Sequence, residues 1–187
     1  MKVGVERMED RPLGALPGLP DRESGRLPGL GEIGLNNFTP YLLNRVVARW
    51  NANLADELRA RDMTTAKMRA LAVLSVTSSL TINELSVLAV TEQSTMSRTV
   101  DALEEQGLIV RTPRADDMRV RDVFITQEGR AVFNKIWPLM YDDLRRMFHN
   151  VGDDEYRTFL AVLHKMLRNM ALVCGSNVDD FQPFGSD

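Results

Sequence analysis

The spacing of apolar residues along the chain predicts a protein that is mainly helical. Between residues 37 and 61 apolar side chains recur at helical intervals, at Phe38, Leu42, Val46, Trp50, Leu54 and Leu58. The same period predicts further helices over about residues 65–76, 127–150 and 154–173. The long helices at the two ends carry apolar stripes that are too extensive for one small domain to cover. We therefore expect them to pair with a second copy of the chain.

A different pattern begins at residue 80, where two short helices are expected in close succession. Thr81 and Glu84 have the spacing of a capping box, and Leu80 and Leu85 stand in the positions of a hydrophobic staple, so a helix should begin here. A second helix is expected over residues 92–106 after a very short turn. It should end at Gly107, because glycine favours the left-handed conformation of a C-terminal cap.

Two β-prone runs, residues 108–112 and 120–125, follow this helix pair and are joined by a loop over residues 113–119. A helix-turn-helix followed by such a hairpin, or wing, is an architecture that lies on double-stranded DNA. The expected fold class is thus mainly α with a small β wing (α+β).

The predicted organisation has a winged helix-turn-helix lobe over residues 63–126, flanked by dimerisation helices over residues 35–62 and 127–174. Residues 1–34 hold seven glycines and four prolines and show little periodicity. Such a composition buries too little surface to offset its ordering entropy, so we expect a flexible or extended arm, either a spacer or an arm that packs on a partner subunit. Residues 175–187 are expected to form a C-terminal tail.

Composition narrows the class of protein further. The chain has 187 residues, a net charge of −3 and one cysteine, Cys174. It lacks an apolar run long enough for a membrane span or a signal peptide, and a single cysteine excludes an internal disulfide framework, so we expect a cytoplasmic protein with no membrane association. Positive charge is concentrated between residues 108 and 121, which hold four arginines against two aspartates. A patch of this size predicts modest non-specific affinity for DNA.

The second helix of the pair has one apolar and one polar face. Met96, Val100 and Leu103 should anchor it in the lobe, which leaves its polar side for base edges and phosphates in the major groove. The predicted DNA contacts on this helix are Gln93, Ser94, Thr95, Ser97 and Arg98. The alternative is an ordinary solvated helix face.

The wing should reach the minor groove, whose negative potential attracts arginine. Arg114 and Arg119 are best placed in the loop, and Asp117 should hold a guanidinium in position by a charge-assisted pair. Arg111 and Arg121 are expected on the strands, in contact with phosphate or solvent. The alternative is that these arginines only make the surface soluble.

Two segments carry a resemblance to a known family. TEQSTMSRTVDALEEQGLIVR and DDMRVRDVFITQEG, together with the order of the helices, resemble the MarR family of winged-helix regulators, and the pattern D-x-R-x-x-x-V-x-I-T from Asp117 to Thr126 is similar to that family's wing signature. The resemblance covers about residues 36–172. The chain departs from it at Ala89-Val90, where many members have glycine, and at Met118, where many have arginine.

The resemblance implies a homodimer that binds a palindromic operator and represses transcription until a small-molecule effector releases it. Effectors of this family are often phenolic or aromatic carboxylates, or their CoA thioesters. The family's effector lies in a cleft between the DNA-binding lobe and the dimerisation helices. The candidates by position are Tyr41, Arg45, Met68, Trp137 and Tyr141, which are alternatively ordinary core or interface residues.

Other classes of function receive less support from the sequence. No phosphate-loop, dinucleotide-binding or nucleophile-elbow pattern occurs, so we expect neither an enzyme nor a cofactor. A redox-responsive regulator would use Cys174, but no basic neighbour is present to lower the pKa of its thiol. His149 and His164 form no compact metal-ligand cluster with that cysteine. An architectural DNA-binding protein that ignores metabolites, or a winged helix used for protein interaction, remains an alternative.

Overall fold

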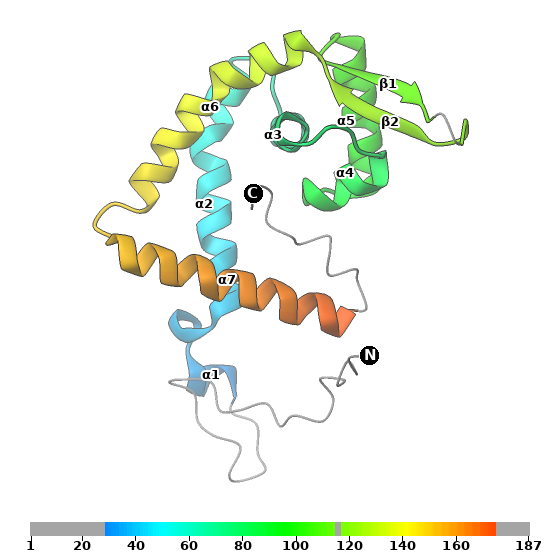
Figure 1. Ribbon diagram of the computed structural model, residues 1–187. Helices are drawn as coiled ribbons and strands as arrows, with labels where there is room; N and C mark the ends of the chain where they lie inside the picture. The colour runs from blue at the N-terminus through cyan, green and yellow to red at the C-terminus, as the bar shows by residue number, and fades with distance from the viewer. Residues whose placement is uncertain (1–28, 115–116, 175–187) are drawn as a thin grey trace. The chain divides into compact units, whose positions relative to one another are not determined.

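Local caps and apolar periodicity produce the order of elements seen in the computed structural model, which describes residues 29–114 and 117–174 (Figure 1). Within these residues the elements are α1 (Leu30–Ile33), the 3-10 helix η3 (Leu35–Asn37), α2 (Thr39–Arg59), α3 (Thr65–Val76), α4 (Ile82–Leu88), α5 (Gln93–Glu105), β1 (Ile109–Pro113), β2 (Arg121–Ile125), α6 (Gln127–Met147) and α7 (Asp153–Cys174). The mainly helical fold with a small β wing is thereby confirmed.

The chain divides into two compact units, and the boundary falls between Trp50 and Asn51, inside α2. The described part of the first unit holds α1, η3 and the beginning of α2. Within the region expected to be a flexible or extended arm, residues 1–34, Leu30–Ile33 forms a single helical turn. This turn is capped locally, since Gly29 N–H donates to the Glu32 carboxylate at 2.8 Å, and a single turn has no apolar period that a sequence pattern could reveal. Residues 1–28 and the expected tail at 175–187 lie outside the described residues.

Helix α3 forms the centre of the second unit, where it packs against α4, α5, α6 and β2 (Figure 1). Its Leu71 and Leu74 are almost fully buried. The predicted apolar face of α5 is confirmed, because Met96, Val100 and Leu103 are all 0% exposed. The core of the second unit therefore fixes α5 from one side only and leaves its opposite side at the surface.

Side-chain caps set where the helices of this unit begin. The Thr64 hydroxyl accepts the backbone N–H of Lys67 at the start of α3. The capping box between Thr81 and Glu84 is present in both directions at the start of α4. Hydrogen bonds from Thr81 lower the pKa of Glu84 below its ordinary value. The start predicted for α4 at Thr81 and the helix predicted from about residue 65 are confirmed.

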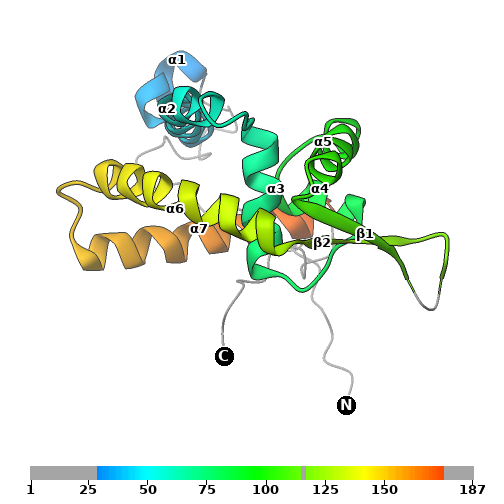
Figure 2. The same cartoon turned by 90° about the horizontal axis from the view of Figure 1, so that it is seen from above.

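The wing is a two-stranded antiparallel sheet in which Ile109 pairs with Ile125 and Pro113 with Arg121 (Figure 2). Leu80, which precedes α4, forms a single antiparallel β-bridge with Val123 of β2. Its N–H donates to the Val123 carbonyl at 3.3 Å, and its carbonyl accepts the Val123 N–H at 2.7 Å. The base of the wing is therefore tied by backbone hydrogen bonds to the start of the helix-turn-helix.

Two glycines allow the chain to leave α5 and enter α6. Gly107 has φ +70° and ends α5, as the sequence predicted. Gly129, in the first turn of α6, lies so close to the strand entry that an added Cβ would stand 2.0 Å from the Leu108 carbonyl oxygen. Thr126 closes this junction, because its hydroxyl donates to the Gly107 carbonyl at 2.8 Å and accepts the Gly129 N–H at 3.0 Å.

The last helix, α7, exposes many large apolar side chains. Among its described side chains these are Phe159, Leu160, Val162, Leu167 and Met170. The Phe148 ring, between α6 and α7, contacts the Tyr156 ring edge-on at a centroid distance of 4.7 Å. None of the helices in the described part of the chain is long and apolar enough to cross a membrane.

Candidate nucleic-acid interface

The polar side of α5 carries the side chains that the sequence assigned to the major groove. Gln93, Ser94, Thr95 and Arg98 are exposed, whereas Ser97 is half-buried. The Gln93 amide donates to the Asn83 side-chain oxygen at 2.6 Å, which ties the first turn of α5 to α4. Sequence reasoning missed Asn83, because only the packed helix pair brings it opposite Gln93.

Arg111 lies on β1, as predicted, but it is bound to acidic side chains of α5. Its guanidinium donates to the Asp101 carboxylate at 2.7 Å and, through Nε at 2.9 Å and a second nitrogen, to the carboxylate of Glu104. The backbone N–H of Arg111 also donates to Glu104 at 3.0 Å. These bonds lower the pKa of Glu104 and raise that of Arg111. The sequence predicted a contact of Arg111 with phosphate or solvent; among the described residues its guanidinium instead binds two carboxylates and joins β1 to α5.

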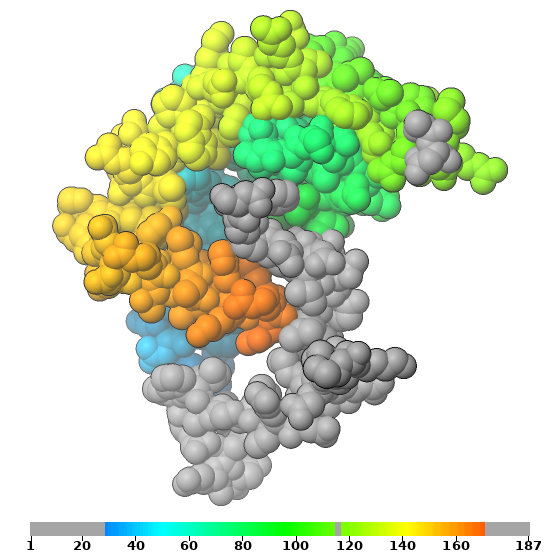
Figure 3. All heavy atoms as spheres, viewed as in Figure 1, coloured from blue at the N-terminus to red at the C-terminus, as the bar shows by residue number. Residues whose placement is uncertain are grey.

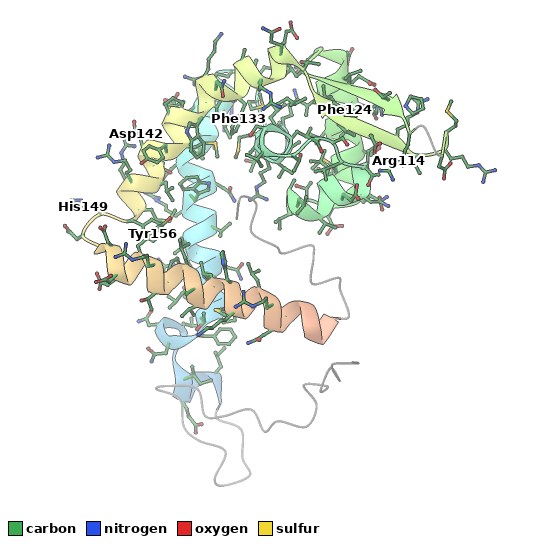
Figure 4. All side chains as sticks on the ribbon, in the orientation of Figure 1. Arg114, Phe124, Phe133, Asp142, His149 and Tyr156 are labelled. Carbon is green, nitrogen blue, oxygen red and sulfur yellow. The ribbon has the colours of Figure 1, made fainter. Side chains whose placement is uncertain are left out.

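Arg114 forms a similar pair within the wing (Figure 4). Its Nε donates to Asp122 at 3.0 Å and its Nη2 donates to the other carboxylate oxygen at 2.6 Å. This two-point bond lowers the pKa of Asp122 below its ordinary value. Asp122 faces Thr112 in the strand register, one step inside the end of the hairpin. The positive charge of Arg114 is thus largely neutralised by the Asp122 carboxylate within the protein itself.

The hairpin of β1 and β2 extends beyond the body of the lobe (Figure 3). Asp117 accepts the backbone N–H of Arg119 at 3.0 Å, so it shapes the turn through the main chain. The expected pair between Asp117 and a guanidinium is not found among the described residues, which exclude positions 115–116. Arg119, at the tip, and Arg121, at the start of β2, are both exposed.

The charge pattern of the interface follows from these pairs. Within residues 29–114 and 117–174, the structure shows no ion pair for Arg98, Arg119 or Arg121, while Arg111 and Arg114 each have a carboxylate partner. A guanidinium without a fixed carboxylate keeps its full charge for a phosphate. In the described residues of the two elements that a winged helix lays on DNA, the arginines left without an ion pair are Arg98 on α5 and Arg119 and Arg121 on the wing.

The five candidate effector residues fall into separate groups. In the first unit, the Arg45 guanidinium carbon lies 5.7 Å from the centre of the Tyr41 ring. In the second unit, the rings of Trp137 and Tyr141 follow one another along α6 at 6.0 Å, and each residue is about half exposed. Met68 is 3% exposed and belongs to the core of the lobe. An open hollow of about 520 Å³ beside α6 is lined by other residues, among them Asp142 and His149.

A helix-turn-helix with an exposed polar recognition helix, joined by ion pairs to an arginine-bearing hairpin, defines a winged-helix DNA-binding protein. The model of the MarR family matches residues 61–119. A MarR-family transcriptional regulator of solved structure from Silicibacter pomeroyi is 46% identical, with 76% of this chain and 96% of that chain covered and a TM-score of 0.72. The chain belongs to the MarR family of transcriptional regulators.

Two further relatives bear on its role. The HTH-type transcriptional repressor IacR of Pseudomonas putida is 25% identical over 143 residues, which are 76% of this chain and 86% of that protein. A mutant of MarR from E. coli, solved in complex with operator DNA, is 26% identical, covers 67% of this chain and 91% of that chain, and has a TM-score of 0.59. These relatives are transcriptional regulators and not enzymes, as the sequence predicted.

Proposed function

We propose that the protein is a homodimeric repressor that binds a palindromic operator and is released from it by a small aromatic acid or its CoA thioester. The observation that carries the proposal is the joint surface of α5 and the wing, where Arg98, Arg119 and Arg121 stand exposed. The proposed contacts are those assigned to α5 from the sequence, with Arg119 and Arg121 on the wing. Arg114 and Asp117 shape the hairpin. Because a repressor must reach its operator DNA, we propose a cytoplasmic location for the protein.

The homodimer is supported by apolar surface that one chain leaves uncovered. The exposed apolar side chains of α7 repeat at helical spacing, and Leu35, Phe38, Leu42, Val46 and Val47 are exposed in the first unit. Exposed apolar side chains that repeat along one helix are typical of a protein interface. A two-fold dimer would present two copies of α5 to successive major grooves about 34 Å apart, which matches a palindromic site.

The effector is proposed from the exposed aromatic pair on α6. Half-exposed rings such as Trp137 and Tyr141 can stack on a planar aromatic ligand. Two proteins of the same fold have small-molecule ligands. CouR of Rhodococcus jostii was solved bound to p-coumaroyl-CoA, and the DNA binding of BpsR of Bordetella bronchiseptica is regulated by 6-hydroxynicotinic acid. At 21% and 20% identity they share the fold, and their ligands suggest which compounds to test.

The DNA-binding part is tested by selecting duplexes from a random-sequence library with the wild-type protein and measuring affinity for the selected site. Arg98→Ala and Arg119→Ala should each weaken binding, because each removes an exposed guanidinium. Arg145→Ala is the matched control, because it also removes an exposed guanidinium, but from the C-terminal end of α6 and not from α5 or the wing. Wild-type affinity in both interface variants would contradict the assignment, and failure to select any duplex would contradict the function.

The other two parts have separate tests. Sedimentation should give the mass of two chains, and a stable monomer would exclude the two-fold model. Titration of the protein–DNA complex with p-coumaroyl-CoA and with aromatic carboxylates should release the DNA, by as much as the ligand prefers the unbound form of the protein. Operator affinity unchanged by every compound in such a panel would favour a regulator that does not respond to this class of ligand.

A further inference from the structure

The turn between α4 and α5 contains a residue in an unfavourable backbone conformation. Val90 has φ +49°, in the left-handed region that a β-branched side chain rarely adopts. Its side chain is 78% exposed, so packing of the valine does not offset this strain. The surrounding structure must hold the turn by other means, and α5 begins only three residues later, at Gln93.

Hydrogen bonds to the main chain hold this turn. The Val90 N–H donates to the Val87 carbonyl at 3.1 Å, and the Thr91 N–H donates to Ser86 at 2.9 Å. The bond from outside the turn comes from Arg69 on α3, whose Nη1 donates to the Val90 carbonyl at 3.1 Å. A hydrogen bond from a charged donor is about twice as strong as a neutral one. It also lies at the C-terminal end of α4, where the helix dipole favours a positive charge.

The same guanidinium reaches a second element. Nη2 of Arg69 donates to the Asn51 side-chain oxygen on α2 at 3.4 Å. Two residues along α2, the Asn53 amide donates to the buried carboxylate of Asp143 on α6 at 3.3 Å. Arg69 therefore stands between the strained turn and a part of α2 that is itself bound to α6.

We propose that Arg69 is a positioning residue for DNA recognition: by binding the Val90 carbonyl and Asn51, it holds the strained turn and thereby fixes the direction of α5. This inference rests on the proposed function, because it concerns how the recognition helix meets its operator. Arg98 lies about 7.5 Å along α5 from Gln93, so a 10° change in direction at Gln93 moves the backbone of Arg98 by about 1.3 Å. Base contacts tolerate less than that.

The proposal predicts that Arg69 matters because residue 90 is not glycine. Glycine adopts the left-handed conformation at no steric cost, so Val90→Gly should remove the need for the Arg69 bond. Arg69→Met keeps an unbranched side chain but no donor. With valine at position 90 it should weaken binding to the selected operator duplex about tenfold, the loss expected for one charge-assisted hydrogen bond. In the Val90→Gly background the same substitution should change affinity by less than about threefold.

A second readout separates positioning from simple charge contact. Binding to a duplex of scrambled sequence should stay within about twofold of wild type in Arg69→Met, because non-specific affinity depends on phosphate contacts. Arg69→Lys keeps the charge and one donor and should recover most of the operator affinity. It also serves as the test variant if Arg69→Met does not fold.

The decisive experiment is the four-protein cycle of wild type, Arg69→Met, Val90→Gly and the double variant, measured by operator affinity and by thermal unfolding. The proposal is supported if Arg69→Met lowers operator affinity and thermal stability less in the Val90→Gly background than in the wild-type background. An equal effect in both backgrounds, no effect in either, or an equal loss on operator and scrambled duplex overturns it. If the wild type selects no operator, the proposed function fails. The unfolding cycle then still decides whether Arg69 stabilises the strained turn.

Discussion

Arg111→Met should loosen the attachment of the wing to α5, and the structure sets the size of the effect. The side chain of Arg111 is 22% exposed, and its guanidinium binds the carboxylates of Glu104 and Asp101, which are 34% and 58% exposed. Hydrogen bonds to charged groups contribute about 1.5–3 kcal/mol when buried, whereas exposed ion pairs contribute about 0–1 kcal/mol. This cluster lies between those limits. Because methionine retains the packing of the side-chain stem, we expect a loss of about 1–2 kcal/mol in the free energy of unfolding.

The destabilisation should depend on pH in a direction that the pKa of Glu104 determines. Hydrogen bonding to Arg111 lowers this pKa below its ordinary value of 4.5. A carboxylate of this kind stabilises the folded state fully above its unfolded pKa, and the contribution is lost as the pH falls through the folded pKa. The difference between wild type and Arg111→Met should therefore be complete at about pH 7 and shrink below about pH 4.5.

Urea unfolding of the two proteins at several pH values tests this reasoning, with Glu104→Gln and Glu105→Gln as companion variants. Glu104→Gln should reproduce most of the pH-dependent loss, whereas Glu105→Gln, at an exposed neighbouring position, should leave stability nearly unchanged. The salt dependence of operator binding should also stay the same in Arg111→Met, because this guanidinium already has carboxylate partners and releases no counterion from DNA. A destabilisation that is equal at about pH 7 and about pH 3 would refute the role assigned to Glu104.

Three other substitutions follow from the packing. Gly129→Ala should lower the free energy of unfolding by about 2–4 kcal/mol, measured by urea titration, since its Cβ would overlap the Leu108 carbonyl. Thr81→Ala should lower it by about 1 kcal/mol through loss of the α4 cap, with little change in the unfolding m-value. Leu160→Glu should shift the sedimenting mass toward one chain at low concentration, because it puts a charge on the exposed apolar side of α7. Stability equal to wild type in either of the first two, or an unchanged dimer in the third, would contradict these expectations.

The helices of the lobe could be predicted because their signals are local. Helix α3 spans Thr65–Val76, the residues that the apolar period gave, since Thr64 caps it within one turn. The start of α4 is fixed in the same way by Thr81 and Glu84, three residues apart. The end of α6 was placed less well: the helix stops at Met147 and not at Asn150. Helix ends fray over a turn, and Gly152, which marks the break in the sequence, lies five residues beyond Met147.

The ion pairs of the interface could not be predicted in the same way, because their partners are brought together by tertiary structure. Arg114 meets Asp122 only once the strand register is known, and Arg111 meets Glu104 only once β1 is laid beside α5. A sign was present in the sequence, since acidic residues lie seven and eight positions from these arginines. The pattern alone does not distinguish such pairs from solvated charges. The close approach at Gly129 likewise depends on where α6 meets the end of α5.

The arginines of the wing divide into two kinds, and this division explains how an acidic chain can bind DNA. Arg111 and Arg114 pair with carboxylates of the same lobe and give the hairpin a fixed shape, while Arg119 and Arg121 stand free of ion pairs in the described part of the chain. Counting all four as phosphate contacts overstates the electrostatic attraction. Because the described part of the wing has few arginines without an ion pair, affinity for DNA has to come from accurate placement of the recognition helix. The strained turn at Val90 thus becomes a point where a single hydrogen bond can govern recognition.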